Sequence, residues 1–144
     1  MSGPTLHAGC VAIQGRGVLV AGPSGSGKSD LMLRLIERGA TLVSDDYVML
    51  RSKAGRLIAA PPPAIAGKIE VRGVGIVERP FVADIPISLL IDLELAPVRL
   101  PEPARRELVG IAIPVIGLNG LEPSAPIKVE AALILHGLFP PCPT

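Results

Sequence analysis

The clearest indication of the architecture is the segment Gly22-Pro23-Ser24-Gly25-Ser26-Gly27-Lys28-Ser29. It matches the pattern G-x-x-x-x-G-K-[ST] of phosphate-binding loops, in which glycines let successive backbone N–H groups point at phosphate oxygens. Lys28 supplies a positive charge, and the hydroxyl of Ser29 can ligate Mg²⁺. The alternative interpretation is a glycine-rich turn with a surface lysine, and the residues on either side of the loop distinguish the two.

These flanking residues have the patterns of a buried strand and an amphipathic helix. The run Val18-Leu19-Val20-Ala21 is apolar throughout, as in central strands that are covered on both faces. Apolar residues at positions 31, 32, 35 and 36 share one helical face, with Asp30 in the first turn and Gly39 just past the end. A strand before the loop and a helix after it favour phosphate binding.

Two further strands are expected around this unit. Residues 7–22 read as a pair of strands joined by a turn at Gly15-Arg16-Gly17. Thr41 to Ser44 form another strand after the helix. A strand, loop, helix and strand in this order predict a right-handed crossover with a parallel pair.

The second half of the chain predicts more strands and one helix. The apolar runs 85–95 and 111–118 are each interrupted by a proline, which favours edge strands or bulges. Residues 126–138 are typical of a helix with Ser124 as a cap, and residues 139–144 of an irregular tail.

Composition limits the class of protein. The 144 residues correspond to one domain, residues 1–144, and the net charge of +1 with only three aromatic residues argues against nucleic acid as a partner. Cys10 and Cys142 lie far apart without a Cys/His cluster, so we expect two buried or inert thiols rather than a zinc site. A signal peptide and a membrane-spanning run of about 20 apolar residues are both missing, which predicts a cytoplasmic protein.

Two acidic motifs are candidates for chemistry on a bound phosphate. Asp45-Asp46 ends the strand after the helix, where carboxylates can hold a metal or accept a proton; the alternative is an ordinary turn. Adjacent residues of a strand point to opposite sides, so one Asp can reach the phosphates while the other does not. In Glu70-Val71-Arg72-Gly73-Val74-Gly75-Ile76, Glu70 and Arg72 project to the same side, and the alternative is a surface ion pair.

Together these motifs resemble one family, the HPr kinase/phosphorylase catalytic C-terminal domain. Its phosphate loop is similar to residues 22–30, its R-G pair before an Asp-Asp to Arg38-Gly39 and Asp45-Asp46, and its signature E-[IV]-R-G-x-G-[IL] to residues 70–76. Its histidine before a hairpin strand is similar to His7. The resemblance covers about residues 5–95 and continues more weakly to Ala132.

The resemblance implies a fold and an activity. The fold is α/β, a P-loop-containing mixed β-sheet with few helices, of the phosphoenolpyruvate-carboxykinase-like/HPr kinase type. The activity is phosphorylation of a serine of an HPr-like phosphocarrier protein, with ATP or pyrophosphate as donor and Mg²⁺ as cofactor. The family also runs the reverse reaction, phosphorolysis of the phosphoserine, in the same site, and it forms hexamers, so a homo-oligomer is expected.

The resemblance also implies roles for individual residues. Nucleotide would bind to the loop residues Gly22, Ser24, Gly25, Ser26, Gly27, Lys28 and Ser29. The metal would be held by Ser29, Glu70 and Asp46. The catalytic residues would be Asp45 as the base toward the serine hydroxyl, His7, and Arg72 acting on phosphate charge.

The chain departs from the family in two respects. It resembles the short stand-alone form found in proteobacteria, without the N-terminal domain of full-length members. The family carries an arginine before a T-I-S-L-like strand, whereas Phe81-Val82-Ala83-Asp84 has none, which predicts weak or absent phosphorylase activity. Two alternatives stay open: a nucleotide-binding sensor that has lost phosphoryl transfer, and a small-molecule kinase related to phosphoenolpyruvate carboxykinase.

Overall fold

A computed structural model of the chain describes residues 4–139, which are built mainly from strands. The strands are β1 (Thr5–Leu6), β2 (Ala8–Ile13), β3 (Arg16–Ala21), β4 (Thr41–Ser44), β5 (Val48–Lys53), β6 (Arg56–Ala60), β7 (Lys68–Val71), β8 (Gly75–Glu78), β9 (Ile85–Asp92), β10 (Arg105–Leu108) and β11 (Ile111–Gly117). The helices are α1 (Lys28–Glu37) and α2 (Ala125–His136), with a short 3-10 turn at Pro63–Ile65. The predicted mixed sheet with few helices is confirmed.

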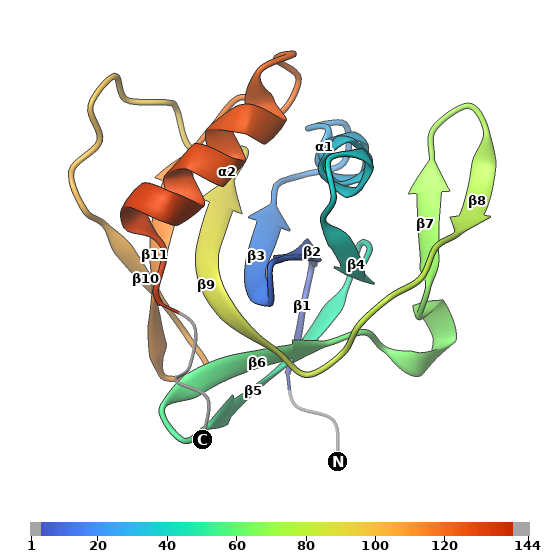
Figure 1. The fold of residues 1–144 in the computed structure, drawn as a ribbon, viewed down its shortest axis with the longest axis horizontal. Helices are drawn as coiled ribbons and strands as arrows, with labels where there is room; N and C mark the ends of the chain where they lie inside the picture. Colours follow the sequence, from blue (N-terminus) through green and yellow to red (C-terminus); the bar gives the residue numbers. More distant parts are fainter. Residues whose placement is uncertain (1–3, 140–144) are drawn as a thin grey trace.

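The main sheet is curled and has β9 near its middle (Figure 1). The strand order is β1-β5-β6-β9-β3-β2-β4, and β11 adds to β9 with β10 beyond it. β3 and β11 run parallel to β9, whereas β6 pairs antiparallel with its first residues. β7 and β8 form a separate hairpin that projects beside α1.

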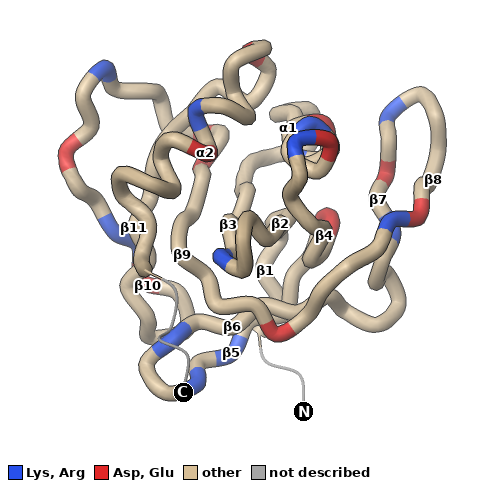
Figure 2. Tube along the Cα trace, in the orientation of Figure 1, with Lys and Arg blue, Asp and Glu red and all other residues tan. Residues whose placement is uncertain are grey.

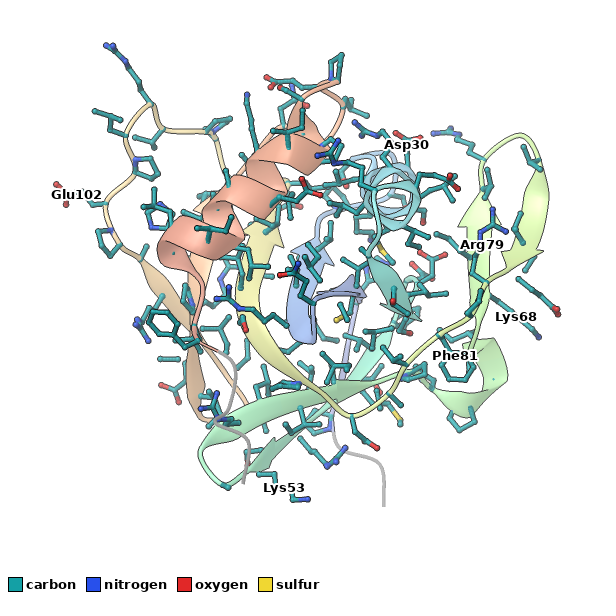
Figure 3. The ribbon with its side chains drawn as sticks, in the orientation of Figure 1. Asp30, Lys53, Lys68, Arg79, Phe81 and Glu102 are labelled. Carbon is teal, nitrogen blue, oxygen red and sulfur yellow. The ribbon has the colours of Figure 1, made fainter. Side chains whose placement is uncertain are left out.

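Both faces of the sheet carry a hydrophobic core. Successive side chains of a strand point to opposite faces. Val18 and Val20 of β3 therefore pack with Leu35 and its neighbours from α1 and α2, and Leu19 packs with Leu57 and other residues inside the curl. Figure 3 shows that side chains fill the space between the helices and the sheet. The prediction that this strand is covered on both sides is confirmed.

The predicted parallel pair of β3 and β4 is not formed. β2 pairs antiparallel with both strands, so β3 and β4 run in the same direction with β2 between them. The reason is the short turn after Ile13, which folds β2 back along the whole length of β3 and occupies that edge. The parallel partner of β3 is β9 instead.

The prolines in β9 and β11 do not make these strands edges, and that part of the prediction was wrong. The alternative, a bulge, is present in β9: Gly17 of β3 pairs with Ile87 but Val18 pairs with Leu89. Pro86 and Pro114 both lie before the stretch in which β9 and β11 pair with each other. That stretch begins at Leu90 of β9 and Val115 of β11. Their missing N–H groups therefore remove no bond from that ladder.

Both predicted helices are confirmed. α1 buries Leu31, Met32 and Leu35, carries Asp30 in its first turn, and is followed by Gly39 at a φ of 111°. α2 has Ser124 at its N-cap position, although the hydroxyl makes no capping hydrogen bond. Within residues 4–139 neither helix combines the length and the apolar character needed to cross a bilayer. Most of the predicted irregular tail, residues 140–144, lies outside the described residues, as does Cys142.

We predict that the Cys10 thiol is unreactive in the folded protein. Cys10 is fully buried in β2, and this burial raises its pKa well above the ordinary value, so the reactive thiolate is scarce. In a Cys142→Ser variant, which isolates Cys10, an aromatic disulfide reagent should label the native chain only at the rate of unfolding and label the urea-unfolded chain at once. Rapid labelling of the native variant would contradict this burial.

Candidate functional site

The glycine-rich loop connects β3 directly to α1. Ser26 closes the loop on itself, because its N–H and its hydroxyl both donate to the carbonyl of Pro23, at 3.1 and 2.6 Å. Gly27 has a φ of 91°, in the left-handed region, and a Cβ there would lie 2.9 Å from Cδ2 of Leu121. Glycine is therefore required at this position both by the backbone conformation and by the neighbouring side chain.

Lys28 is a buried cation beneath the loop. Its side chain is almost fully covered, at 7% exposure, and its Nζ donates to the Gly22 carbonyl at 2.7 Å. The Nε2 atom of His7 lies 3.2 Å away, and among residues 4–139 no carboxylate forms an ion pair with this lysine. A buried ammonium with only neutral partners is costly. A phosphate anion in the loop would supply the missing charge, so the residues present fit such a ligand.

Asp45 is buried at the end of β4, with 6% exposure, and both of its oxygens accept hydrogen bonds. The Ser29 hydroxyl donates to Oδ1 at 2.8 Å, and the backbone N–H of Glu70 donates to Oδ2 at 2.9 Å. The carboxylate therefore connects the start of α1 to β7 and does not line the cleft. It lies one layer behind the surface that a ligand would touch.

Asp46 faces the opposite way and lines the cleft. Its φ of 68° turns the chain sharply after Asp45, a conformation that Asp tolerates better than most residues. Nε2 of His7 lies 2.9 Å from Asp46 Oδ1, and the ring of His7 also packs on Tyr47, with 4.9 Å between centroids. Asp46, His7 and Lys28 thus form a row. A proton on Nε2 lets His7 donate to Asp46, whereas the bare nitrogen accepts from Lys28.

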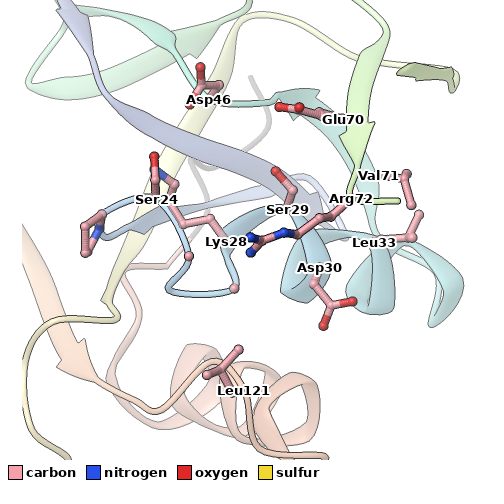
Figure 4. A pocket seen from close by; sticks show the side chains of 13 residues that line it. Ser24, Lys28, Ser29, Asp30, Leu33, Asp46, Glu70, Val71, Arg72 and Leu121 are labelled. Carbon is pink, nitrogen blue, oxygen red and sulfur yellow. The ribbon is translucent and has the colours of Figure 1, made fainter. Parts of the chain in front are cut away.

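The side chains of the loop, α1 and β7 enclose one cleft of about 620 Å³. Glu70 and Arg72 project into it from β7, as their spacing predicted, and Arg72 makes no ion pair with a described residue. Figure 4 shows Asp46 and Glu70 at one end of the cleft, the loop in the middle and Leu121 at the opposite end. The lining residues are Pro23, Ser24, Gly25, Gly27, Lys28, Ser29, Asp30, Leu33, Asp46, Glu70, Val71, Arg72 and Leu121.

The cleft is not a preformed metal cage. Within residues 4–139 no three His, Cys, Asp or Glu side chains gather closely enough to hold an ion. Mg²⁺ is usually bound by one or two protein oxygens together with phosphate oxygens and water, and Ser29 with Glu70 or Asp46 fits that mode. Charges of both signs are spread over the surface (Figure 2), so the attraction for phosphate is local to the cleft.

The structure brings most of the predicted site residues together. Glu70, Arg72 and Asp46 line the cleft, and His7 contacts both Lys28 and Asp46. The predicted loop residues that line it are Ser24, Gly25, Gly27, Lys28 and Ser29, whereas Gly22 and Ser26 do not. Arg79 is the basic residue nearest to the position of the family arginine that this chain lacks. It lies at the base of the hairpin and does not line the cleft (Figure 3). The sequence analysis missed Leu121, because its loop belongs to no motif and reaches the cleft only through folding.

Comparisons with known proteins agree on one family. A family model described as "HPr Serine kinase C-terminal domain" matches residues 2–83, which include every predicted site residue. The HPr kinase/phosphorylase of Clostridium botulinum (strain Eklund 17B / Type B) is 45% identical over 73 residues, which cover 51% of this chain and 24% of that protein. The protein of the same name from Clostridium tetani is 45% identical over 75 residues, covering 52% of this chain and 25% of that protein. The matches therefore span about a quarter of the length of these curated relatives.

A solved structure extends the likeness over nearly the whole fold. The Hpr(Ser) kinase/phosphatase from Coxiella burnetii superposes with a TM-score of 0.82 at 30% sequence identity. The superposition covers 92% of this chain and 95% of the other.

We predict that the two neighbouring aspartates differ in their effect on stability. Asp45→Asn places an amide N–H₂ against one of the two donors, Ser29 or Glu70, and should lower the free energy of unfolding by about 1–2 kcal/mol. Asp46→Asn is the matched control and should change it by less than about 0.5 kcal/mol, because Asp46 is exposed. Urea unfolding measures both values, and faster hydrogen exchange at the Glu70 amide should accompany only the Asp45 change. Equal losses in the two variants would contradict the assigned connection.

Proposed function

The chain belongs to the HPr serine kinase C-terminal domain family, and we propose that it phosphorylates a serine of an HPr-like phosphocarrier protein. The observation that carries this proposal is the buried Lys28, which has no carboxylate partner among residues 4–139, in one cleft with Asp46 and Glu70. A site of this kind binds phosphate and also holds carboxylates for transfer chemistry. The donor is ATP or pyrophosphate, and the protein acts in the cytoplasm.

The phosphate chain is held by the loop. The loop residues Ser24, Gly25, Gly27 and Lys28 line the cleft at the start of α1, and Lys28 adds a positive charge. Arg72, directly after β7, extends over the cleft and forms no ion pair with a described residue, so its guanidinium is free to bind transferring phosphate oxygens.

Ser29 and Glu70 are the proposed protein ligands of Mg²⁺. When bound, the ion neutralises charge on the phosphate oxygens. Asp45 orients both residues, because it accepts hydrogen bonds from the Ser29 hydroxyl and the Glu70 backbone N–H.

The geometry favours Asp46 as the base. The resemblance predicted Asp45 for this role and Asp46 for the metal, yet both oxygens of Asp45 are engaged behind the cleft, and Asp46 lies within it. The serine hydroxyl oxygen attacks the terminal phosphorus and its proton passes to the Asp46 carboxylate. The bond from that phosphorus to the bridging oxygen breaks, and its electron pair leaves with ADP when ATP is the donor or with orthophosphate when pyrophosphate is the donor. His7 holds the Asp46 carboxylate in place.

A nucleotide sensor without transfer activity is the second candidate. The absence of an arginine from Phe81-Val82-Ala83-Asp84 favours it, since removal of transition-state charge can cost about 10³-fold or more in rate. The same absence supports weak or absent phosphorolysis by an active kinase. Retention of Asp46, His7 and Glu70 in the cleft favours the kinase, because a sensor needs no base.

A transfer assay with radiolabelled ATP, Mg²⁺ and HPr-type carrier proteins tests the kinase. We expect label on a carrier serine, its loss in Lys28→Ala, and a rate on the order of 100-fold or more lower in Asp46→Asn with nucleotide binding kept. If Asp46→Asn transfers normally and Asp45→Asn does not, the base is Asp45. Nucleotide binding without label on any carrier would support the sensor.

We also propose that copies of the chain associate, as the resemblance to a hexameric family implies. The outer face of α2 supports this proposal: Ile127, Ile134 and Leu135 are 54, 81 and 77% exposed, and Ala131 lies among them. Large apolar faces of this kind are commonly covered by a partner, and a helix that packs on its own copy is self-complementary.

Light scattering of the purified chain should give a mass that is a multiple of the single-chain value. Leu135→Lys should lower that mass, because a charge in the apolar face would have to be desolvated. Lys68→Glu, an exposed change on the hairpin, is the control and should leave the mass unchanged. A monomeric wild-type protein would contradict the proposed association.

A further inference from the structure

The cleft has two chemically different ends. Asp46 and Glu70 occupy one end, where the proposed transfer takes place, and Leu121 stands at the other, beyond the glycine-rich loop (Figure 4). A nucleoside triphosphate also has two chemically different ends, with its terminal phosphate at one end and its base at the other. With the terminal phosphate beside Asp46 and the phosphate chain on the loop, the base is directed away from Asp46 and Glu70 and past Asp30, whose carboxylate is paired with Arg34 at 3.0 Å.

Leu121 is a large apolar side chain left open to the cleft. It is 65% exposed, and its Cδ2 lies against Gly27, where even a methyl group would come within 2.9 Å. The side chain thus touches the backbone that holds the phosphates and keeps most of its apolar surface uncovered. Its surface is available to a ligand that is already bound at the loop.

The segment that carries Leu121, residues 118–124 between β11 and α2, is held in place by polar contacts. Arg34 of α1 donates to the carbonyls of Gly120 and Glu122, the latter at 2.8 Å, and so ties the segment to the helix that begins at the loop. Asn119 accepts the N–H of Leu121 at 3.0 Å through its side chain. Leu121 is therefore a positioned side chain and not the tip of a loose loop.

Gly120 brings this segment close to the phosphate loop. A Cβ at Gly120 would lie 2.9 Å from Cδ1 of Leu93 and 3.1 Å from the carbonyl of Ser26. A larger residue there would push the segment away from the loop. The two glycines, Gly27 and Gly120, allow the two backbones to approach until Leu121 reaches the cleft.

The other leucine of the cleft, Leu33, is used differently. It is half-buried and packs against the main hydrophobic core from the middle of α1. Its surface already stabilises the fold, whereas that of Leu121 does not contribute to either core cluster. Of the two leucines, Leu121 is the one with a free apolar face.

We propose that Leu121 forms the nucleobase subsite: the base of a nucleoside triphosphate packs on its side chain while the phosphates bind to the loop. The inference rests on the proposed kinase function, which supplies the orientation of the ligand. Burial of an apolar side chain against a flat aromatic base is favourable, and truncation of Leu121 to Ala should weaken ATP binding about tenfold. Pyrophosphate lacks a base, so its affinity should not change.

Calorimetric titration with Mg²⁺-ATP and with Mg²⁺-pyrophosphate tests the inference. We expect Leu121→Ala to weaken ATP binding about tenfold while pyrophosphate binding stays within about twofold. Leu121→Met, which keeps the apolar surface, should bind ATP like the wild type. Leu33→Ala is the matched control on the other wall, and thermal unfolding monitors the integrity of each variant.

The outcomes separate the inference from the function on which it rests. If Leu121→Ala weakens both ligands equally or neither, or if Leu33→Ala selectively weakens ATP, the base does not pack on Leu121. If the wild type binds neither ATP nor pyrophosphate, the proposed function fails and the subsite fails with it.

Discussion

The arrangement of the cleft depends on the buried carboxylate of Asp45. A buried carboxylate is stable only when its oxygens find donors, and here the donors come from two distant segments, the Ser29 hydroxyl on α1 and the Glu70 backbone N–H on β7. The hairpin β7–β8 pairs with no other described strand. Asp45 therefore contributes a polar attachment that orients Glu70, and the neighbouring Arg72, toward the loop.

The same constraint separates the roles of two adjacent aspartates. With Asp45 turned inward, the positive φ of Asp46 turns the next side chain outward to His7 and the cleft. Asp45 then connects α1 to β7, and Asp46 lies in the cleft beside His7. Lys28 completes the arrangement from below the loop, where its Nζ donates to the Gly22 carbonyl and lies beside His7.

The opposite wall of the cleft is held in place by hydrogen bonds to its backbone groups. Segment 118–124 has no regular structure, and it is positioned by Arg34, by the side chain of Asn119 and by the close approach of Gly120 to the loop. Arg34 belongs to the helix that starts at the loop. The phosphate-binding unit thus organises both walls, one through Ser29 and Asp45 and the other through Arg34.

Features that depend only on residues close together in the sequence could be predicted from it. The loop, the strand before it, helix α1 and the shared side of Glu70 and Arg72 follow from local backbone preferences and from apolar periodicity, which act over a few residues. The second helix also followed from its local pattern. The family resemblance rested on the same motifs and was confirmed by the match to residues 2–83.

Features that depend on contacts between distant residues could be assigned only from the folded chain. β2 lies between β3 and β4 because the short turn after Ile13 pairs β2 with the whole length of β3. β9 lies near the middle of the sheet although it contains Pro86 and a bulge between Ile87 and Leu89. No local pattern distinguishes Asp45 from Asp46, or marks Leu121 as part of a cleft. These assignments depend on the donors, glycines and apolar surfaces that the folded chain brings together. The residues involved lie far apart in the sequence, so their spacing does not predict these contacts.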